Sequence, residues 1–200
     1  MTRKIGIFLY PEVEVLDFAG PYEVFTCATR VARLQDPQAE APFDVCTIAA
    51  TREPVRARAG LSVLPDHAQD SHDPLDVLLI PGGMVDRELG RAATINWIAR
   101  TSAQVPLTAS VCSGALLLAQ AGLLEGRPAT THWSDVEQLQ GYPNVQVLPQ
   151  RRWTDDGGIV TSGGISAGID MALYLVQRFA GRELALATAH RMEYAWNEQG

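Results

Sequence analysis

A short apolar segment, Leu107 to Val111, leads directly into Cys112, and the chain then becomes strongly helical. Ser113 and Gly114 follow the cysteine and permit a sharp change of direction. This pattern predicts a strand, a tight turn and a helix, with Cys112 at the apex. Such a turn places the side chain at the positive end of a helix, where a thiolate is favoured. The segment therefore predicts a reactive thiol on an α/β fold; the alternative is a buried cysteine at a strand end.

Short apolar runs alternate with helical segments along the rest of the chain. We expect a loop from Pro11 to Asp17 and a helix that starts at Pro21 and runs to about Leu34. Strands are expected at Lys4–Tyr10, Phe43–Ala50, Asp76–Ile80, Leu107–Val111 and Ile159–Thr161, and further helices at about Arg91–Gln104 and at Ala167–Ala180. This order predicts a doubly wound, mainly parallel sheet flanked by helices, in a single domain spanning residues 1–200.

Four candidate site residues each follow a predicted strand: Asp17, Gly82, Gly83 and Cys112. Ligands of such folds bind beyond the carboxyl ends of the strands, so we expect these residues on one rim of the sheet. The apolar surroundings of Asp17 would raise the pKa of its carboxyl group and suit it to proton transfer, although an N-cap role is equally consistent. The peptide N–H groups of Gly82, Gly83 and Ser113 suit an oxyanion hole, the alternative being a simple turn.

The histidines give weaker signals than the cysteine. His132 lies at the end of a predicted strand, Ala129–Trp133, and is either a base or ligand-orienting group of the site or a buried histidine bonded to the backbone. His190 and Glu193 do not have the spacing of a His-x-Glu pair. The sequence therefore offers no convincing Cys–His–Asp triad, and a carboxyl group is the expected proton partner of Cys112.

Composition excludes several classes of protein. The net charge is −7 and no run rich in Lys or Arg is present, which argues against binding to nucleic acid. No apolar run reaches the length of a membrane span, so we expect a cytoplasmic protein with no membrane partner. The three cysteines lack the spacing of a disulfide framework or a zinc site, and we predict no metal.

Several segments together resemble the ThiJ/PfpI superfamily, which shares the glutamine-amidotransferase-like, flavodoxin-like fold. They are Tyr10 to Val13, Leu16 with Asp17, Gly20 with Pro21, Ile80 to Gly83, Ser110 to Gly114, Ala129 to Trp133 and Gly163 to Asp170. Within this superfamily the likeness is greatest to the isonitrile hydratase branch. Peptidase-like members carry a histidine directly after the cysteine, whereas this chain has Ser113 there.

The resemblance implies a homodimeric enzyme that hydrates a small organic isonitrile to an N-substituted formamide. Cys112 would be the nucleophile, Asp17 the proton donor, and Ser113 with Gly83 would position the adduct. His132 stays a candidate for positioning, and neither a metal nor an organic cofactor is required. Two alternatives remain open: a redox or ligand sensor that uses Cys112 without turnover, and a glyoxalase-like or amidase activity. The amino-terminal domains of AraC-type regulators are similar too, but no helix-turn-helix region is expected in this chain.

Overall fold

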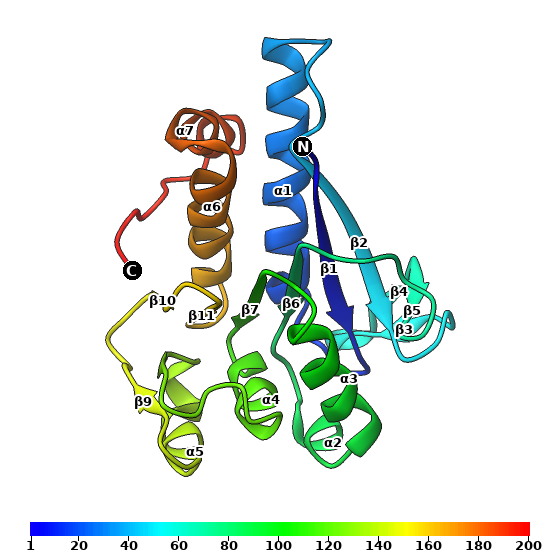
Figure 1. Cartoon of the computed structure of the whole chain (residues 1–200), viewed down its shortest axis with the longest axis vertical. Coiled ribbons are helices and arrows are strands. Elements are labelled where there is room, and N and C mark those ends of the chain that lie inside the picture. Colours follow the sequence, from blue (N-terminus) through cyan, green and yellow to red (C-terminus); the bar gives the residue numbers. More distant parts are fainter.

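A seven-stranded sheet forms the centre of the structure, a computed structural model that describes all 200 residues (Figure 1). The strand order is β10-β11-β7-β6-β1-β2-β5. All neighbouring strands pair in parallel except β10 and β11, which are antiparallel. The strands are β1 (Arg3–Leu9), β2 (Phe43–Ala49), β5 (His67–Ala68), β6 (Val77–Ile80), β7 (Leu107–Val111), β10 (Trp153–Asp155) and β11 (Ile159–Ser162). The predicted doubly wound, mainly parallel sheet is confirmed.

The direction of winding reverses between β1 and β6. From β1 the chain continues to β2 on one side, whereas β6, β7 and β11 follow one another on the other side. The loops that leave β1 and β6 therefore run in opposite directions and open a crevice at the carboxyl edge of the sheet. This reversal fixes where a ligand site can form, because Asp17 follows β1 and Gly82 follows β6.

Two groups of helices cover opposite faces of the sheet, because right-handed crossovers in opposite winding directions place their helices on opposite sides. Figure 1 shows α1, α6 and α7 packed together, and α2, α3 and α4 as a second group in the lower part of the view. The helices of the first group are α1 (Val15–Gln35), α6 (Ala167–Ala180) and α7 (Arg182–Arg191). Those of the second group are α2 (Asp86–Leu89), α3 (Ala92–Ser102) and α4 (Gly114–Gln120).

The central strands are buried on both faces, which explains their continuous apolar sequences. Every residue of β6 and every residue of β7 is buried. A single hydrophobic cluster of 45 buried residues joins the strands to both helix groups. No helix is both long enough and apolar enough to cross a membrane.

Smaller elements frame the carboxyl edge of the sheet. A hairpin of β3 (Val55–Arg56) and β4 (Ser62–Val63), joined through the 3₁₀ turn η1 (Arg58–Gly60), lies beside the loop that follows β1. A parallel pair, β8 (Pro128–Ala129) and β9 (Gln146–Val147), encloses the 3₁₀ turn η2 (Trp133–Asp135) and helix α5 (Val136–Gln140). The expected strand Ala129–Trp133 is therefore wrong beyond Ala129, and His132 is the N-cap residue of η2.

Helix α1 begins earlier than the sequence pattern predicts. The expected start was Pro21, but the helix begins at Val15 and contains Pro21 in its interior. Proline is tolerated there although it has no N–H group for the carbonyl of Asp17, four residues earlier. Asp17 consequently lies in the first helical turn rather than in a loop. The N-cap residue is Glu14, so the interpretation of Asp17 as an N-cap is wrong.

Candidate active site

Cys112 occupies a tight elbow between β7 and α4. Its φ angle is +58°, a left-handed conformation that residues other than glycine rarely adopt. Its N–H group donates to the carbonyls of Ser162 (3.1 Å) and Gly163 (3.3 Å), and its own carbonyl accepts from Thr131 Oγ1 at 2.9 Å. Two separate segments thus hold this backbone in place, as expected where a strained conformation serves a site. The predicted strand, turn and helix around Cys112 are confirmed.

Gly114 allows the elbow to lie against the end of β6. A Cβ atom at this position would lie 2.2 Å from the carbonyl oxygen of Ile80. We expect Gly114→Ala to lower the free energy of unfolding by about 1–3 kcal/mol, because rigid backbone would have to move. Denaturant unfolding measures this loss. Gly158→Ala is the matched control, since a Cβ there meets no atom within 4 Å; equal losses in the two variants would contradict the argument.

Asp17 lies beneath the thiol and is fully buried. Its Oδ2 atom accepts a hydrogen bond from the N–H of Gly82 at 3.1 Å, while Oδ1 is buried without a protein partner. The pKa of this carboxyl group is raised to about 7, mainly by burial; the Cys112 thiol and the N–H of Gly82, from which the carboxylate accepts, act in the opposite direction, and the charge of Glu14 adds to the increase. The carboxyl group can therefore gain or lose a proton near neutral pH.

The pKa of the Cys112 thiol is raised, not lowered. Burial is the main cause, and the neighbouring Asp17 carboxylate adds to it, while the N–H of Ser113 favours the thiolate. This is opposite to the expectation that the helix terminus makes Cys112 a thiolate at rest, because desolvation outweighs the effect of the elbow. Cys112 and Asp17 are instead two neighbouring buried groups that influence each other's pKa, and the pair can share one proton.

The peptide N–H groups of the two glycines after β6 form hydrogen bonds within the protein. The N–H of Gly82 binds Asp17 as described, and the N–H of Gly83 donates to Ser113 Oγ at 2.9 Å. Ser113 Oγ lies 3.0 Å from the Gly83 carbonyl, to which it donates in return. These contacts place Gly82, Gly83 and Ser113 beside Cys112, as the sequence predicts, but the two glycine N–H groups serve here to position Asp17 and Ser113.

His132 belongs to the same site and brings Asp135 with it. One ligand atom each of Cys112, His132 and Asp135 lie within 4.8 Å of one another. Ser134 Oγ links His132 and Asp135, since it lies 2.6 Å from His132 Nδ1 and donates to Asp135 Oδ1 at 3.0 Å. Asp135 is not among the residues predicted from the sequence, because its place in the site depends on the 3₁₀ turn η2 and on the approach of this turn to Cys112.

Gly164 lets the imidazole approach the thiol. A Cβ atom at this position would lie 2.4 Å from His132 Cδ2 and 2.7 Å from Cys112 Sγ. We expect Gly164→Ala to push these groups apart and to slow alkylation of Cys112 by iodoacetamide at least about tenfold, because small displacements at a site have large effects on rate. Peptide mass spectrometry measures the rate. Gly163→Ala, whose Cβ would meet only ordinary contacts, should alkylate like the wild type; a slow control would contradict the prediction.

A cavity of about 300 Å³ opens above Cys112 and Ser113. Its apolar wall consists of Met84, Val85, Leu116 and Ile165. Its charged lining consists of Glu14, Arg58, Asp86, His132 and Asp135. Arg58 Nη1 lies 3.4 Å from Glu14 Oε2, so the one arginine of the lining is already paired. The cavity suits a small molecule without a negative charge, because three carboxylates line it and its one arginine is paired.

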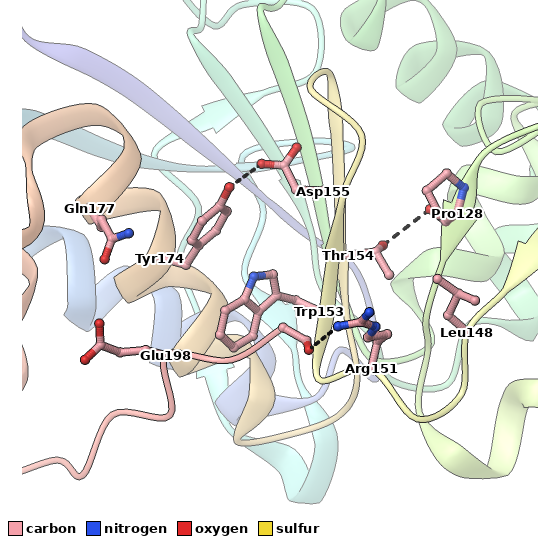
Figure 2. A pocket seen from close by; sticks show the side chains of 10 residues that line it. Pro128, Leu148, Arg151, Trp153, Thr154, Asp155, Tyr174, Gln177 and Glu198 are labelled. Atoms are coloured by element: carbon pink, nitrogen blue, oxygen red, sulfur yellow. Dashed lines mark hydrogen bonds between the residues drawn. The ribbon is translucent and has the colours of Figure 1, made fainter.

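A second hollow, of about 420 Å³, lies at the β10 edge of the sheet (Figure 2). Trp153 and Tyr174 stack with their ring centres 5.7 Å apart. Tyr174 Oη donates to Asp155 Oδ2 at 2.6 Å, and Arg151 Nη1 donates to the carbonyl of Gly200 at 3.1 Å, as Figure 2 shows. No cysteine or histidine lines this hollow, so it lacks the reactive groups found in the cavity above Cys112.

A match to a known protein family covers most of the chain. Residues 3–178 match the DJ-1/PfpI family. The chain belongs to the DJ-1/PfpI family. This membership confirms the predicted superfamily, and the solved structures agree with it. A THiJ/PfpI family protein from Pseudomonas syringae superposes with a TM-score of 0.86 at 28% identity, over 98% of this chain and 77% of that one. DJ-1beta of Drosophila melanogaster superposes with a TM-score of 0.83 at 21% identity, over 98% of this chain and 100% of that one. At this level of identity the likeness supports the fold alone.

Two relatives of this DJ-1/PfpI member differ in function. An isonitrile hydratase from Pseudomonas putida is 36% identical over 98% of this chain and 80% of its own length. The HTH-type transcriptional regulator CdhR of Pseudomonas aeruginosa is 31% identical over 96% of this chain, which spans 55% of the regulator. The family therefore includes both an enzyme and a regulator at similar levels of identity.

Proposed function

We propose that this protein hydrates a small organic isonitrile to an N-substituted formamide. The observation that carries the proposal is the buried pair of Cys112 and Asp17: the nucleophile lines the cavity, and a neighbouring buried carboxyl group has a pKa of about 7. The similarity to an isonitrile hydratase over 98% of the chain supports it. An isonitrile is small and carries no net negative charge, which is compatible with the size of the cavity and with its carboxylates.

The first step forms a covalent intermediate. Cys112 Sγ forms a bond to the terminal carbon of the isonitrile, and the proton held by the Cys112–Asp17 pair moves to that carbon. The carbon–nitrogen triple bond becomes a double bond, which leaves a thioimidate on Cys112. A raised thiol pKa is compatible with this step, because the substrate needs both the sulfur and the proton.

The second step releases the formamide. The Asp17 carboxylate accepts a proton from water while the water oxygen adds to the thioimidate carbon. The carbon–sulfur bond then breaks. One proton of the water ends on the formamide nitrogen, and the other returns to the Cys112–Asp17 pair. Ser113, held by Gly83, positions the adduct, and His132 borders it. Neither a metal nor an organic cofactor enters this reaction.

The proposal includes a homodimer in the cytoplasm. The three cysteines of the chain form no disulfide, as is usual in a reducing compartment. The experiment that tests the function is formamide production from a small aliphatic isonitrile, followed by chromatography. Steady turnover by the reduced protein is expected. No turnover, with Cys112 shown to be reduced and reactive, would overturn the proposal.

A sensor is the second candidate, because the regulator CdhR matches 96% of this chain. In a sensor, two molecules of hydrogen peroxide would oxidise the Cys112 thiol to a sulfinate and leave as water. The unpartnered Oδ1 of Asp17, when protonated, would donate to the sulfinate. Addition of two oxygens at Cys112 without any turnover of isonitrile would favour this function.

A third candidate is a glyoxalase-like or amidase activity. The sequence offers no Cys–His–Asp triad by spacing, but the fold brings His132 and Asp135 to Cys112. His132 could then act as a base in amide hydrolysis. Assays with glutamine and with methylglyoxal test this alternative, and hydrolysis of the amide in preference to the isonitrile would favour it.

A further inference from the structure

The grouping of Cys112, His132 and Asp135 presents three different donor atoms to one point. A thiol sulfur, an imidazole nitrogen and a carboxylate oxygen lie within 4.8 Å of one another. Tetrahedral coordination of zinc places such donor atoms about 3.5 Å apart. Side-chain rotations that move the donor atoms by about 1 Å therefore suffice to surround an ion. The three residues come from the β7–α4 elbow and the η2 turn, so local sequence spacing does not reveal the set.

We propose that this site reversibly binds a divalent cation of the zinc class through Cys112, His132 and Asp135. Sulfur, nitrogen and oxygen donors together suit zinc better than magnesium or calcium, which prefer oxygen alone. Three protein ligands leave a fourth position for water, on the side of the 300 Å³ cavity. Because the ion occupies the sulfur of Cys112, its binding blocks the nucleophile.

Ser134 organises two of the ligands. Its hydroxyl donates to Asp135 Oδ1, so its oxygen can accept from an Nδ1–H of His132, 2.6 Å away. With the proton on Nδ1, the lone pair of Nε2 is available to a metal. A hydrogen-bonded partner on the other ring nitrogen is typical of histidines that bind metals. In the tautomer with the proton on Nε2, the Ser134 peptide N–H donates to Nδ1 at 3.3 Å, so binding of the ion requires the other tautomer.

Binding of the ion must displace one proton. The bond from the metal to Cys112 Sγ replaces the S–H bond, and the proton passes to the Asp17 carboxylate or to solvent. No redox change occurs. Zinc binding is therefore expected to release a proton, which calorimetry in two buffers of different ionisation enthalpy measures.

Zinc chloride and cobalt chloride are the probes, added to the reduced full-length protein without substrate. We expect one zinc ion per chain in isothermal titration calorimetry. The cobalt complex should show a thiolate-to-cobalt charge-transfer band in the near ultraviolet. Cys112→Ala should lose this band. Since no step of the assay involves turnover, failure of this proposal is distinguishable from failure of the proposed hydratase activity.

Asp135→Asn and Asp86→Asn form the matched pair of variants. Both residues line the cavity, but only Asp135 belongs to the donor set. We expect Asp135→Asn to weaken zinc binding at least about tenfold and Asp86→Asn less than about twofold. Cys46→Ser controls for the one cysteine that is only partly buried and should bind like the wild type. Equal affinities in the two aspartate variants, binding lost in Cys46→Ser, or a cobalt complex without the charge-transfer band would each overturn the proposal.

Discussion

Replacement of Cys112 by alanine is expected to abolish formamide production, with a loss of turnover of about 10⁴-fold or more. The reason is that the proposed reaction passes through a covalent bond to Sγ, for which no other group of the cavity can substitute. The remaining cysteines, Cys27 and Cys46, lie in α1 and β2 and do not line the cavity. Chromatography of the formamide product from a small aliphatic isonitrile measures the loss.

Two kinds of control make this result decisive. Cys27→Ala and Cys46→Ala should keep wild-type turnover, and circular dichroism should show that Cys112→Ala is folded. Cys112→Ser should also be inactive, because a hydroxyl is a much weaker nucleophile than a thiol in the same position. An active Cys112→Ser enzyme would contradict a mechanism that starts with attack by sulfur.

The sheet and the elbow could be predicted from sequence because their signals are local. β6 and β7 are continuous runs of residues that are buried on both faces, and glycines follow closely after each strand. The start of α1 was mispredicted for an equally physical reason. Pro21 is a strong helix-start signal, but packing of the apolar residues before it, such as Phe18, extends the helix back to Val15.

The electrostatics of the site could not be predicted from the same local signals. The elbow alone favours a thiolate, yet burial and the Asp17 carboxylate raise the pKa of Cys112. How deeply a side chain is buried depends on elements distant in sequence, here the start of α1 against the end of β6. Asp135 was missed for a similar reason, since its importance comes from the approach of η2 to the elbow.

The pair of Cys112 and Asp17 therefore differs from a thiolate activated by histidine. Burial raises the pKa of both groups, and the Asp17 carboxylate raises that of the thiol further, so the pair holds at least one proton over a wide pH range. A substrate that needs both a nucleophile and a proton at the same carbon exploits this arrangement. An amide substrate instead needs its proton at the leaving nitrogen, on the side where His132 lies.

Asp17→Asn is expected to change both turnover and the pH dependence of stability. Turnover should fall by about 10²–10⁴-fold, because asparagine can neither donate nor accept the proton of the reaction. Folding raises the pKa of Asp17 from its ordinary value of 3.8 to about 7. Between these values the native protein binds more protons at this site than the unfolded chain, so this site's contribution to stability decreases as pH rises. An asparagine side chain does not titrate, so the variant lacks this decrease.

The sign and size of the effect follow from this linkage. The contribution of protonated Asp17 to the free energy of unfolding is fully present below about pH 4 and is lost as pH rises through about 7. The variant should therefore gain stability relative to the wild type by up to about 4 kcal/mol between about pH 4 and about pH 8. Urea unfolding at several pH values measures the difference. Asp86→Asn, which removes an exposed carboxylate from the same cavity, should show little of this trend. If Asp17→Asn and Asp86→Asn followed parallel curves, the buried carboxyl group could not be the titrating partner of Cys112.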